Sequence, residues 1–518
     1  MQITAGKFRI RRPGQVDWPS VILWSMTIVL ALMLIVSRMG RSLWLDEALT
    51  LTLAKGSFAQ LLDSVLNYQP TPLPYYAAAW SFSKVFGTDE VALRAVSLFF
   101  AIFSIGAFYL CAREFSSPAL SRTGTLVFAA VALRAGVAFS ARPYSMGLAL
   151  SLLATWLFIR WIKHPTWARA FAYSLGLALV ACTHFMLLSV AAFHLSLLVA
   201  FPNIRERLKQ SSLQLGTMFF VTALLLLPVA KHFLFAVSHS NGLTFIGMPG
   251  PKEVVKALFL PYGPVLLIAA ILPVLFSSVR STQRPVAPSY VKISALWLLV
   301  PVAVFALGSY VLNRAIFVPR YFTWQLPAFA LVGAAILHHY QTHLRSFATA
   351  ALCAAFLIIG DVHSPWLFEN WRSAIASLQE MNAKEQHPVF LYSGLIESSQ
   401  LDWLVNDEAG RILLSGPAGA YGLTPQPILL PYDNQAKPLK AYLDYSIAKA
   451  ALEDDTVYLL VRVMPRVQQP GLPETTTNQI FIDEFAAFDF APQESWSYGD
   501  IQLTRLKKQN SLPEIGEN

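Results

Sequence analysis

Two adjacent carboxylates, Asp46 and Glu47, follow the first long apolar run of this 518-residue chain. A carboxylate placed against a hydroxyl can accept its proton while the oxygen forms a new bond. Only one of two neighbouring carboxylates can take this role, and the other could orient the acceptor or bind a metal. The alternative is a solvated acidic pair at the start of a helix, where carboxylates are also favourable.

Three arginines near the ends of later apolar runs could bind an anionic group. Arg142 is followed closely by Tyr144, and Arg320 is followed by Tyr321. Arg314 lies in a loop shortly before Arg320. A guanidinium offers a rigid fork of donors that matches a phosphate. A reaction in which a phosphate is the leaving group needs such a cation, because negative charge grows on the phosphate as its bond breaks. The alternative for these arginines is contact with lipid headgroups.

The elements that position these residues are predicted to be membrane-spanning helices. Hydrophobic residues make up 55% of the chain and charged residues 13%, whereas soluble domains carry about 25% charged residues. Because about 20 apolar residues cross the hydrocarbon core, we expect about eleven spans. They are 19–37, 91–111, 122–139, 143–162, 169–183, 185–201, 213–234, 257–279, 292–312, 321–338 and 345–361.

Charge divides the chain into two domains. Residues 1–362 carry 28 Lys plus Arg against 10 Asp plus Glu, whereas residues 363–518 carry 11 against 20. The basic excess indicates topology and not nucleic-acid binding. Lys and Arg in the short connections lie on the side of the N-terminus, which is therefore expected in the cytoplasm. An odd number of spans then places the long first loop, 38–90, and the C-terminal domain on the extracytoplasmic face.

The predicted fold class is a polytopic α-helical membrane protein with a small C-terminal α/β soluble domain. Two amphipathic stretches of the first loop, split by a proline cluster at 70–74, fit helices that lie in the membrane interface. In the tail, a helical pattern at 371–381 precedes strand-like runs that start at 388 and 456. No Gly-rich phosphate loop supports an ATP-driven pump, and the three cysteines are not spaced as a zinc site.

Four motifs carry a family resemblance. They are Leu43-Trp-Leu-Asp-Glu-Ala, the segment Gln69 to Tyr76, Ala141-Arg-Pro-Tyr-Ser and Pro319-Arg-Tyr-Phe. In this order they resemble motifs of the GT-C superfamily of polytopic glycosyltransferases, over most of residues 1–361. The chain is most similar to bacterial relatives of protein O-mannosyltransferases, which form glycosyltransferase family 39, and of the lipid A aminoarabinose transferase.

The resemblance implies a transferase with Asp46 as its catalytic carboxylate and Glu47 in support. By the same resemblance, the phosphate of a polyprenyl-monophosphate sugar would be held by Arg142, Tyr144, Arg320 and Tyr321. Transfer would invert the anomeric centre, on the extracytoplasmic face of a bacterial inner membrane, and the acceptor could be a protein, a lipid or a glycan. A divalent cation near the two carboxylates remains an open alternative. Further candidates for substrate contacts are Arg41, Gln69, Tyr75, Tyr76 and His184.

Two positions depart from the family pattern. Gln69 precedes the proline and tyrosine segment where the family commonly has a histidine, and Ser140 and Ala141 stand where it often has an acidic residue. A transporter or flippase for a lipid-linked sugar is the alternative function, because it would also need many spans and a few charges at membrane depth. Transporters commonly show inverted repeats, which we do not find here. An inactive lipid-binding scaffold would keep the arginines without needing Asp46.

Overall fold

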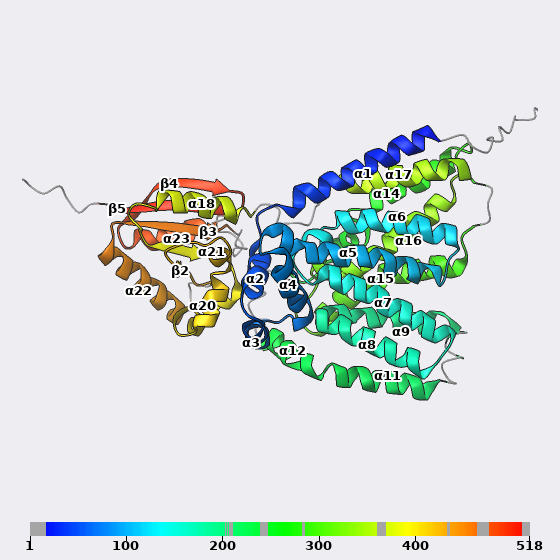
Figure 1. Ribbon diagram of the computed structural model, residues 1–518, viewed down its shortest axis with the longest axis horizontal. Coiled ribbons are helices and arrows are strands. Elements are labelled where there is room, and N and C mark those ends of the chain that lie inside the picture. Colours follow the sequence, from blue (N-terminus) through cyan, green and yellow to red (C-terminus); the bar gives the residue numbers. More distant parts are fainter. Residues whose placement is uncertain are drawn as a thin grey trace, which may run out of the picture.

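The computed structural model describes residues 17–202, 204, 206, 211–238, 247–281, 285–359, 369–432, 436–463 and 476–509. Figure 1 shows a bundle of long helices with a smaller α/β domain at one end of it. The bundle helices are α1 (Trp18–Met39), α5 (Glu90–Arg113), α6 (Pro118–Arg134), α7 (Tyr144–Lys163), α8 (Trp167–Thr183), α9 (Val190–Ala200), α11 (Ser212–Leu225), α12 (Ala230–Ser238), α13 (Pro251–Phe259), α14 (Gly263–Leu275), α15 (Pro288–Val311), α16 (Leu326–His338) and α17 (Thr342–Ile358). Short 3₁₀ turns lie between them: η1 (Val137–Phe139), η2 (Phe185–Ser189), η3 (Leu227–Val229) and η5 (Pro319–Gln325).

Four described helices, α1, α5, α7 and α15, are long and apolar enough to cross a membrane. Two bent pairs, Ser212–Leu225 with Leu227–Phe235 and Pro251–Phe259 with Gly263–Leu275, raise this number to six if each pair is one span. Each of the eleven expected segments overlaps a described helix, but eleven spans are not confirmed. The reason is length, since α9 has only 11 residues and α16 only 13, fewer than the about 20 that a straight span needs.

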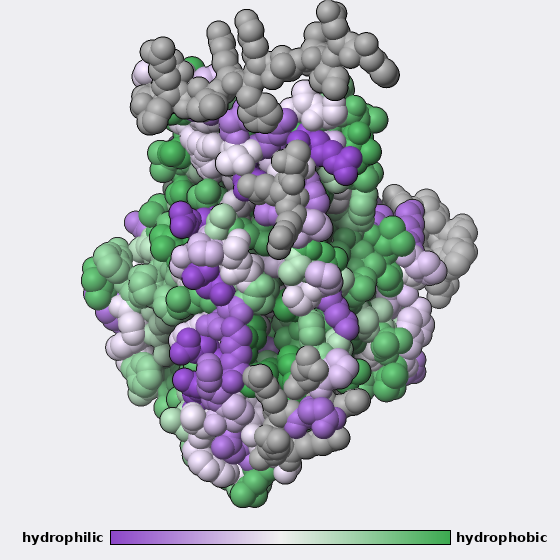
Figure 2. Space-filling view, turned by 90° about the vertical axis from the view of Figure 1, so that its right-hand side faces the viewer, coloured by the Kyte–Doolittle hydropathy of each residue, from purple (hydrophilic) through white to green (hydrophobic). Residues whose placement is uncertain are grey.

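The outward surface of the bundle is apolar, as a bilayer requires. On α1 the exposed side chains include Met26, Val29, Leu32, Met33 and Val36. Figure 2 looks onto the end of the bundle away from the α/β domain, where hydrophilic residues gather toward the middle and hydrophobic residues occupy much of the margin. These features indicate a membrane protein.

The first loop folds into three short helices at the other end of the bundle. They are α2 (Leu45–Lys55), α3 (Phe58–Tyr68) and α4 (Leu73–Phe86). Ser57 and Gln60 form a reciprocal capping box at the start of α3. Pro72 precedes α4, and the proline that follows within its first turn fits there because the first helical N–H groups have no partner in the helix.

The C-terminal domain is built on a five-stranded mixed sheet in the order β2-β1-β3-β5-β4. Its strands are β1 (Val389–Tyr392), β2 (Ile428–Leu429), β3 (Thr456–Arg462), β4 (Phe490–Tyr498) and β5 (Ile501–Lys508). Its helices are α18 (Trp371–Met381), α19 (Leu401–Val405), α20 (Glu408–Leu414), α21 (Gly416–Ala420), α22 (Lys437–Glu453) and α23 (Thr477–Ala486), with η7 (Ile396–Ser399) before α19. The expected helix at 371–381 and the expected strands are present. The expected domain boundary at 362/363 lies outside the described residues.

The first loop and the C-terminal domain share one hydrophobic core. Trp44 and Leu45 of the loop pack in the same cluster as Trp371 and Leu378 of α18 and Tyr458 of β3. In Figure 1 the domain accordingly lies against α2, at the end of the bundle that carries the first loop. The loop is therefore held between the bundle and the domain.

Candidate active site

Glu47 is fully buried and holds the first loop in place. Its Oε1 accepts hydrogen bonds from Arg94 Nε at 3.0 Å and from the Ala141 N–H at 2.7 Å. Its Oε2 pairs with Arg94 Nη2 and accepts from the Trp44 N–H at 3.3 Å. With these four donors around its two oxygens, Glu47 fixes the start of α2 to α5 and to the segment before α7. Its position favours a structural role.

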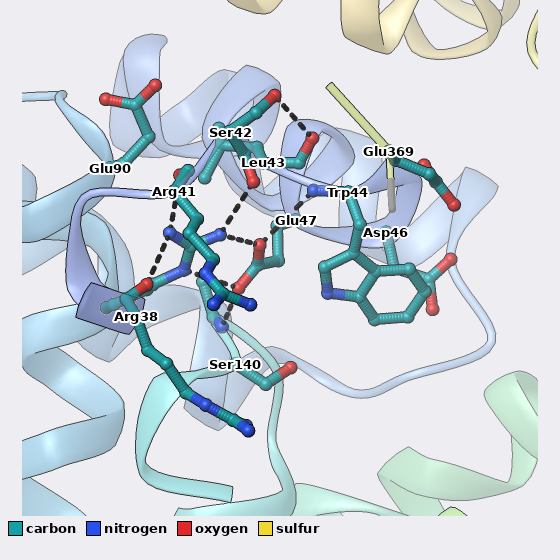
Figure 3. Close-up of polar contacts among 12 residues, drawn as sticks. Arg38, Arg41, Ser42, Leu43, Trp44, Asp46, Glu47, Glu90, Ser140 and Glu369 are labelled. Atoms are coloured by element: carbon teal, nitrogen blue, oxygen red, sulfur yellow. Dashed lines mark hydrogen bonds and ion pairs between the residues drawn. The ribbon is translucent and has the colours of Figure 1, made fainter. Parts of the chain in front are cut away.

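Asp46 points in a different direction from Glu47, as Figure 3 shows. Its Oδ2 lies 3.7 Å from Arg142 Nε and 3.8 Å from Arg320 Nη1. The Asp46 side chain is 21% exposed, so a ligand can reach it. Both arginines thus approach the more accessible carboxylate of the pair, without closing a hydrogen bond of normal length to it.

Both guanidiniums stay charged in this setting. Burial lowers the pKa of Arg142, but the charges of Tyr76, Asp46, Tyr144 and Tyr75 together raise it, and the net shift is upward. The pKa of Arg320 is raised chiefly by Tyr144, with burial opposing this and Asp46 adding to it. Two permanent positive charges therefore face one carboxylate.

The tyrosines of α4 differ in their surroundings. The Tyr76 hydroxyl accepts a hydrogen bond from Arg142 Nη1 at 3.2 Å and donates to Gln69 Oε1 at 3.4 Å. The Tyr75 hydroxyl instead lies 2.8 Å from Ser97 Oγ on α5. Tyr76 and Gln69 thus belong to the arginine site, whereas Tyr75 fixes α4 to the bundle.

An aromatic group borders the two arginines. The His184 ring centroid lies 6.0 Å from that of Tyr144 and 5.2 Å from that of Tyr321, and Arg320 lies over the Tyr321 ring at 5.9 Å. Burial, with further effects of Arg142 and Arg320, lowers the pKa of His184 to about 3. His184 is therefore neutral. It lies between α8 and η2 in the chain, and its ring faces the site.

Buried polar atoms without a hydrogen-bond partner gather on the segments around this site. Among the residues that the structure describes, they include Ser140 Oγ, Arg142 Nε, Ser145 Oγ, His184 Nδ1, Arg320 Nε and Thr323 Oγ1. The segments are neighbours, since η5 contacts both α7 and η2. Buried polar groups in native proteins nearly always have partners, so a polar ligand is the simplest explanation for this concentration.

Two predicted site residues lie at the periphery. Arg41 is exposed, and its Nε donates to the Ser37 carbonyl at 3.2 Å. Arg314 is exposed in the turn after α15. The ion pairs of Asp46 described above are made by the other two candidate arginines.

A divalent cation does not fit these residues. No three His, Cys, Asp or Glu side chains in the described part of the chain form a group that could hold a metal. Glu47 is occupied by N–H donors, and Asp46 already faces two guanidinium groups. A metal ion would be a third cation there and would be repelled, and a cofactor is not established.

Three residues of the C-terminal domain contact the first loop beside this site. The sequence did not indicate any of them as site residues. Glu369 accepts a hydrogen bond from the Leu45 N–H at 2.9 Å, Tyr421 accepts from the Leu43 N–H at 2.7 Å, and Arg372 Nη2 donates to the Gly40 carbonyl at 2.9 Å. Their sequence signal is weak, because the partners are backbone groups more than 300 positions away.

The fold and site together define a helical membrane protein in which two arginines lie beside a reachable carboxylate. A scan against protein-family models finds no match, and a search of curated proteins finds none either. Among solved structures, the chain is similar to ArnT from Cupriavidus metallidurans bound to undecaprenyl phosphate, with 13% identity and a TM-score of 0.45 over 94% of this chain and 97% of that chain. It is also similar to the oligosaccharyltransferase of Archaeoglobus fulgidus in complex with Zn and sulfate, with 14% identity and a TM-score of 0.47 over 85% and 67% of the two chains.

Proposed function

We propose that this protein is a membrane glycosyltransferase that takes its sugar from a polyprenyl-monophosphate donor. The observation that carries the proposal is the pair Arg142, which is buried, and Arg320, which is half-buried. Each lies within 4 Å of Asp46 and keeps an Nε–H without an acceptor among the described residues. Two such groups suit a phosphate, because a hydrogen bond between a guanidinium and a phosphate is stronger than one between neutral groups.

In this proposal the phosphate of the donor binds between the two guanidiniums, and its polyprenyl chain lies in the bilayer. Tyr76 supports Arg142 through its hydroxyl. Tyr144, Tyr321 and His184 border the same space and suit the sugar, because aromatic faces pack against the apolar faces of sugar rings while their polar atoms bind hydroxyl groups.

Asp46 is the proposed base. An acceptor hydroxyl oxygen attacks the anomeric carbon, and its proton passes to the Asp46 carboxylate. The bond from the anomeric carbon to the phosphate oxygen breaks, and the electron pair leaves with the polyprenyl phosphate. Arg142 and Arg320 stabilise the charge that grows on this leaving group, which lowers the barrier because the donors are already in place. Direct displacement of this kind inverts the anomeric centre.

The charge pattern along the chain supports the proposed location. Basic residues lie where the bundle helices end or begin, away from the first loop, as in Arg113, Arg160, Lys163 and Arg169. By the positive-inside preference this end is cytoplasmic. The site and the C-terminal domain would then face the opposite side, outside the bacterial inner membrane, where a protein, lipid or glycan could serve as acceptor.

The experiment is transfer in proteoliposomes that contain one polyprenyl-phosphate sugar at a time. The proposal predicts that one donor is consumed, that free polyprenyl phosphate appears in equal amount and that Asp46→Asn abolishes both changes. The matched control is Asp63→Asn, because Asp63 is an exposed carboxylate on the same loop that bonds Asn67. Movement of intact donor across the bilayer, without release of its sugar, would identify a flippase and refute the transferase.

A further inference from the structure

We propose that the C-terminal domain is part of the catalytic unit, and that Glu369 is a positioning residue that sets the place of Asp46. The proposal rests on the proposed function, because it takes the role of Asp46 from there. The domain would act through the backbone of the first loop, at the residue that directly precedes Asp46.

Glu369 lies at the first described position of the C-terminal domain and is 3% exposed. Its Oε2 accepts from the Leu45 N–H and from Trp371 Nε1, both at 2.9 Å. Its Oε1 accepts from Arg462 Nε at 2.8 Å, and Arg462 Nη2 lies at 2.7 Å. One carboxylate thus joins the sheet of the domain to the first residue of α2.

The chemistry of this contact requires a carboxylate. All four partners of Glu369 are N–H donors, and only an ionised carboxylate offers acceptors to all of them. The Leu45 N–H belongs to the first turn of α2, whose N–H groups have no partner within the helix. A negative charge at this end of a helix is also favourable because of the helix dipole.

Two more side chains of the domain bind the backbone just before Asp46. The Tyr421 hydroxyl accepts from the Leu43 N–H at 2.7 Å and lies 3.3 Å from Ser42 Oγ. Arg372 Nη2 donates to the Gly40 carbonyl at 2.9 Å, and its Nε bonds Glu90 at 2.8 Å. Contacts at Gly40, Leu43 and Leu45 therefore fix the path of residues 40–45 from the side of the domain.

The bundle holds the same turn from the opposite side. Arg94 Nη1 donates to the carbonyls of Arg38 at 3.2 Å and Met39 at 3.0 Å, and Glu47 joins α2 to Arg94. In Figure 3 Glu369 and Asp46 lie on the same side of Trp44, with Glu47 on the other. The contacts from the C-terminal domain and those from Arg94 and Glu47 together set the direction of the Asp46 side chain.

Catalysis would depend on this arrangement because a base must lie within hydrogen-bond reach of its proton. A displacement of about 1 Å at a reacting group can cost about 100-fold in rate. Neither Glu369 nor Tyr421 is among the residues that contact the arginines of the phosphate site. Loss of either contact should therefore lower kcat and leave donor affinity unchanged.

The test compares three variants of the full-length protein in proteoliposomes. Glu369→Gln keeps the shape but places an NH₂ group against an N–H donor, and Tyr421→Phe removes only the hydroxyl. The control is Glu484→Gln, at a residue of α23 in the same domain. This change removes the ion pair between Glu484 and Lys440. We measure kcat, the Kd for undecaprenyl phosphate, and hydrogen exchange of the peptide that covers residues 43–50.

We expect Glu369→Gln and Tyr421→Phe to lower kcat by about 10- to 100-fold with an unchanged Kd, and to speed exchange in the peptide 43–50. The control should change none of these values. Rates and exchange equal to those of the control would overturn the positioning role while leaving the transferase intact. If the wild type transfers no sugar, the proposed function fails, and the exchange measurement still decides whether the domain holds the α2 N-terminus.

Discussion

Replacing Asp46 by Asn should abolish transfer and at the same time tighten the binding of polyprenyl phosphate. Asp46 Oδ2 lies 3.7 Å from Arg142 Nε and 3.8 Å from Arg320 Nη1, so a phosphate bound to both arginines lies close to the carboxylate. Two negative charges about 5 Å apart repel by about 3 kcal/mol at an effective dielectric constant near 20. Because Asp46 is 21% exposed, screening reduces this to about 1–2 kcal/mol, or about 5- to 30-fold in Kd.

The assay measures two quantities on the same preparation. Kd comes from titration of the detergent-purified protein with undecaprenyl phosphate, and transfer comes from release of free polyprenyl phosphate in proteoliposomes. Loss of a general base typically costs about 100-fold or more. Asp63→Asn, with an exposed carboxylate on α3, should leave both quantities at the wild-type value.

Two results would refute the reasoning. Transfer at the wild-type rate by Asp46→Asn would exclude Asp46 as the base. A Kd that is unchanged or weaker would show that the phosphate does not bind beside the carboxylate, and the arginine pair would then need another ligand.

Three further predictions concern the surroundings of the carboxylate. Arg320→Met should weaken undecaprenyl phosphate binding by about 10-fold or more, since a hydrogen bond to a charged group contributes about 1.5–3 kcal/mol, whereas Arg314→Met, at an exposed arginine, should leave the Kd unchanged in the same titration. Glu47→Gln should lower the free energy of unfolding by about 3 kcal/mol or more, measured by thermal unfolding in detergent, because the buried Arg94 charge loses its partner. Tyr76→Phe should weaken phosphate binding by less than Arg320→Met, because it removes only one hydroxyl that accepts from a site arginine.

Each of these predictions has a contradicting outcome. Equal Kd values for the Arg320 and Arg314 variants would show that Arg320 only contacts lipid headgroups. An unfolding midpoint for Glu47→Gln equal to that of the wild type would exclude Glu47 as a structural partner of Arg94. A Tyr76→Phe variant with a larger loss of affinity than Arg320→Met would place Tyr76, and not the arginine, in direct contact with the phosphate.

The coarse architecture could be predicted from the sequence because it depends on local patterns. Apolar runs of helical length predict helices, and short runs rich in apolar and β-branched residues predict strands such as β3 in the tail. The count of spans could not be predicted in the same way. A helix such as α16 is apolar enough to resemble a span but ends after 13 residues, and hydropathy does not show where a helix ends.

The site illustrates the same limit at the level of single residues. Adjacent carboxylates Asp46 and Glu47 are indistinguishable in sequence, but successive positions on a helix point about 100° apart, so one faces Arg94 and the other faces Arg142. Glu369 could not be found at all. Its partner is a backbone N–H 324 positions away, and such a partner leaves no pattern in side-chain types.

The most direct test of the central claim is native mass spectrometry of the detergent-purified protein exposed to a panel of polyprenyl-phosphate sugars, with the double variant Arg142→Ala/Arg320→Ala beside the wild type. If the two arginines hold the donor phosphate, the wild type retains one donor from the panel and the double variant loses it. Failure of the wild type to retain any polyprenyl phosphate, or equal retention by the variant, would contradict this claim.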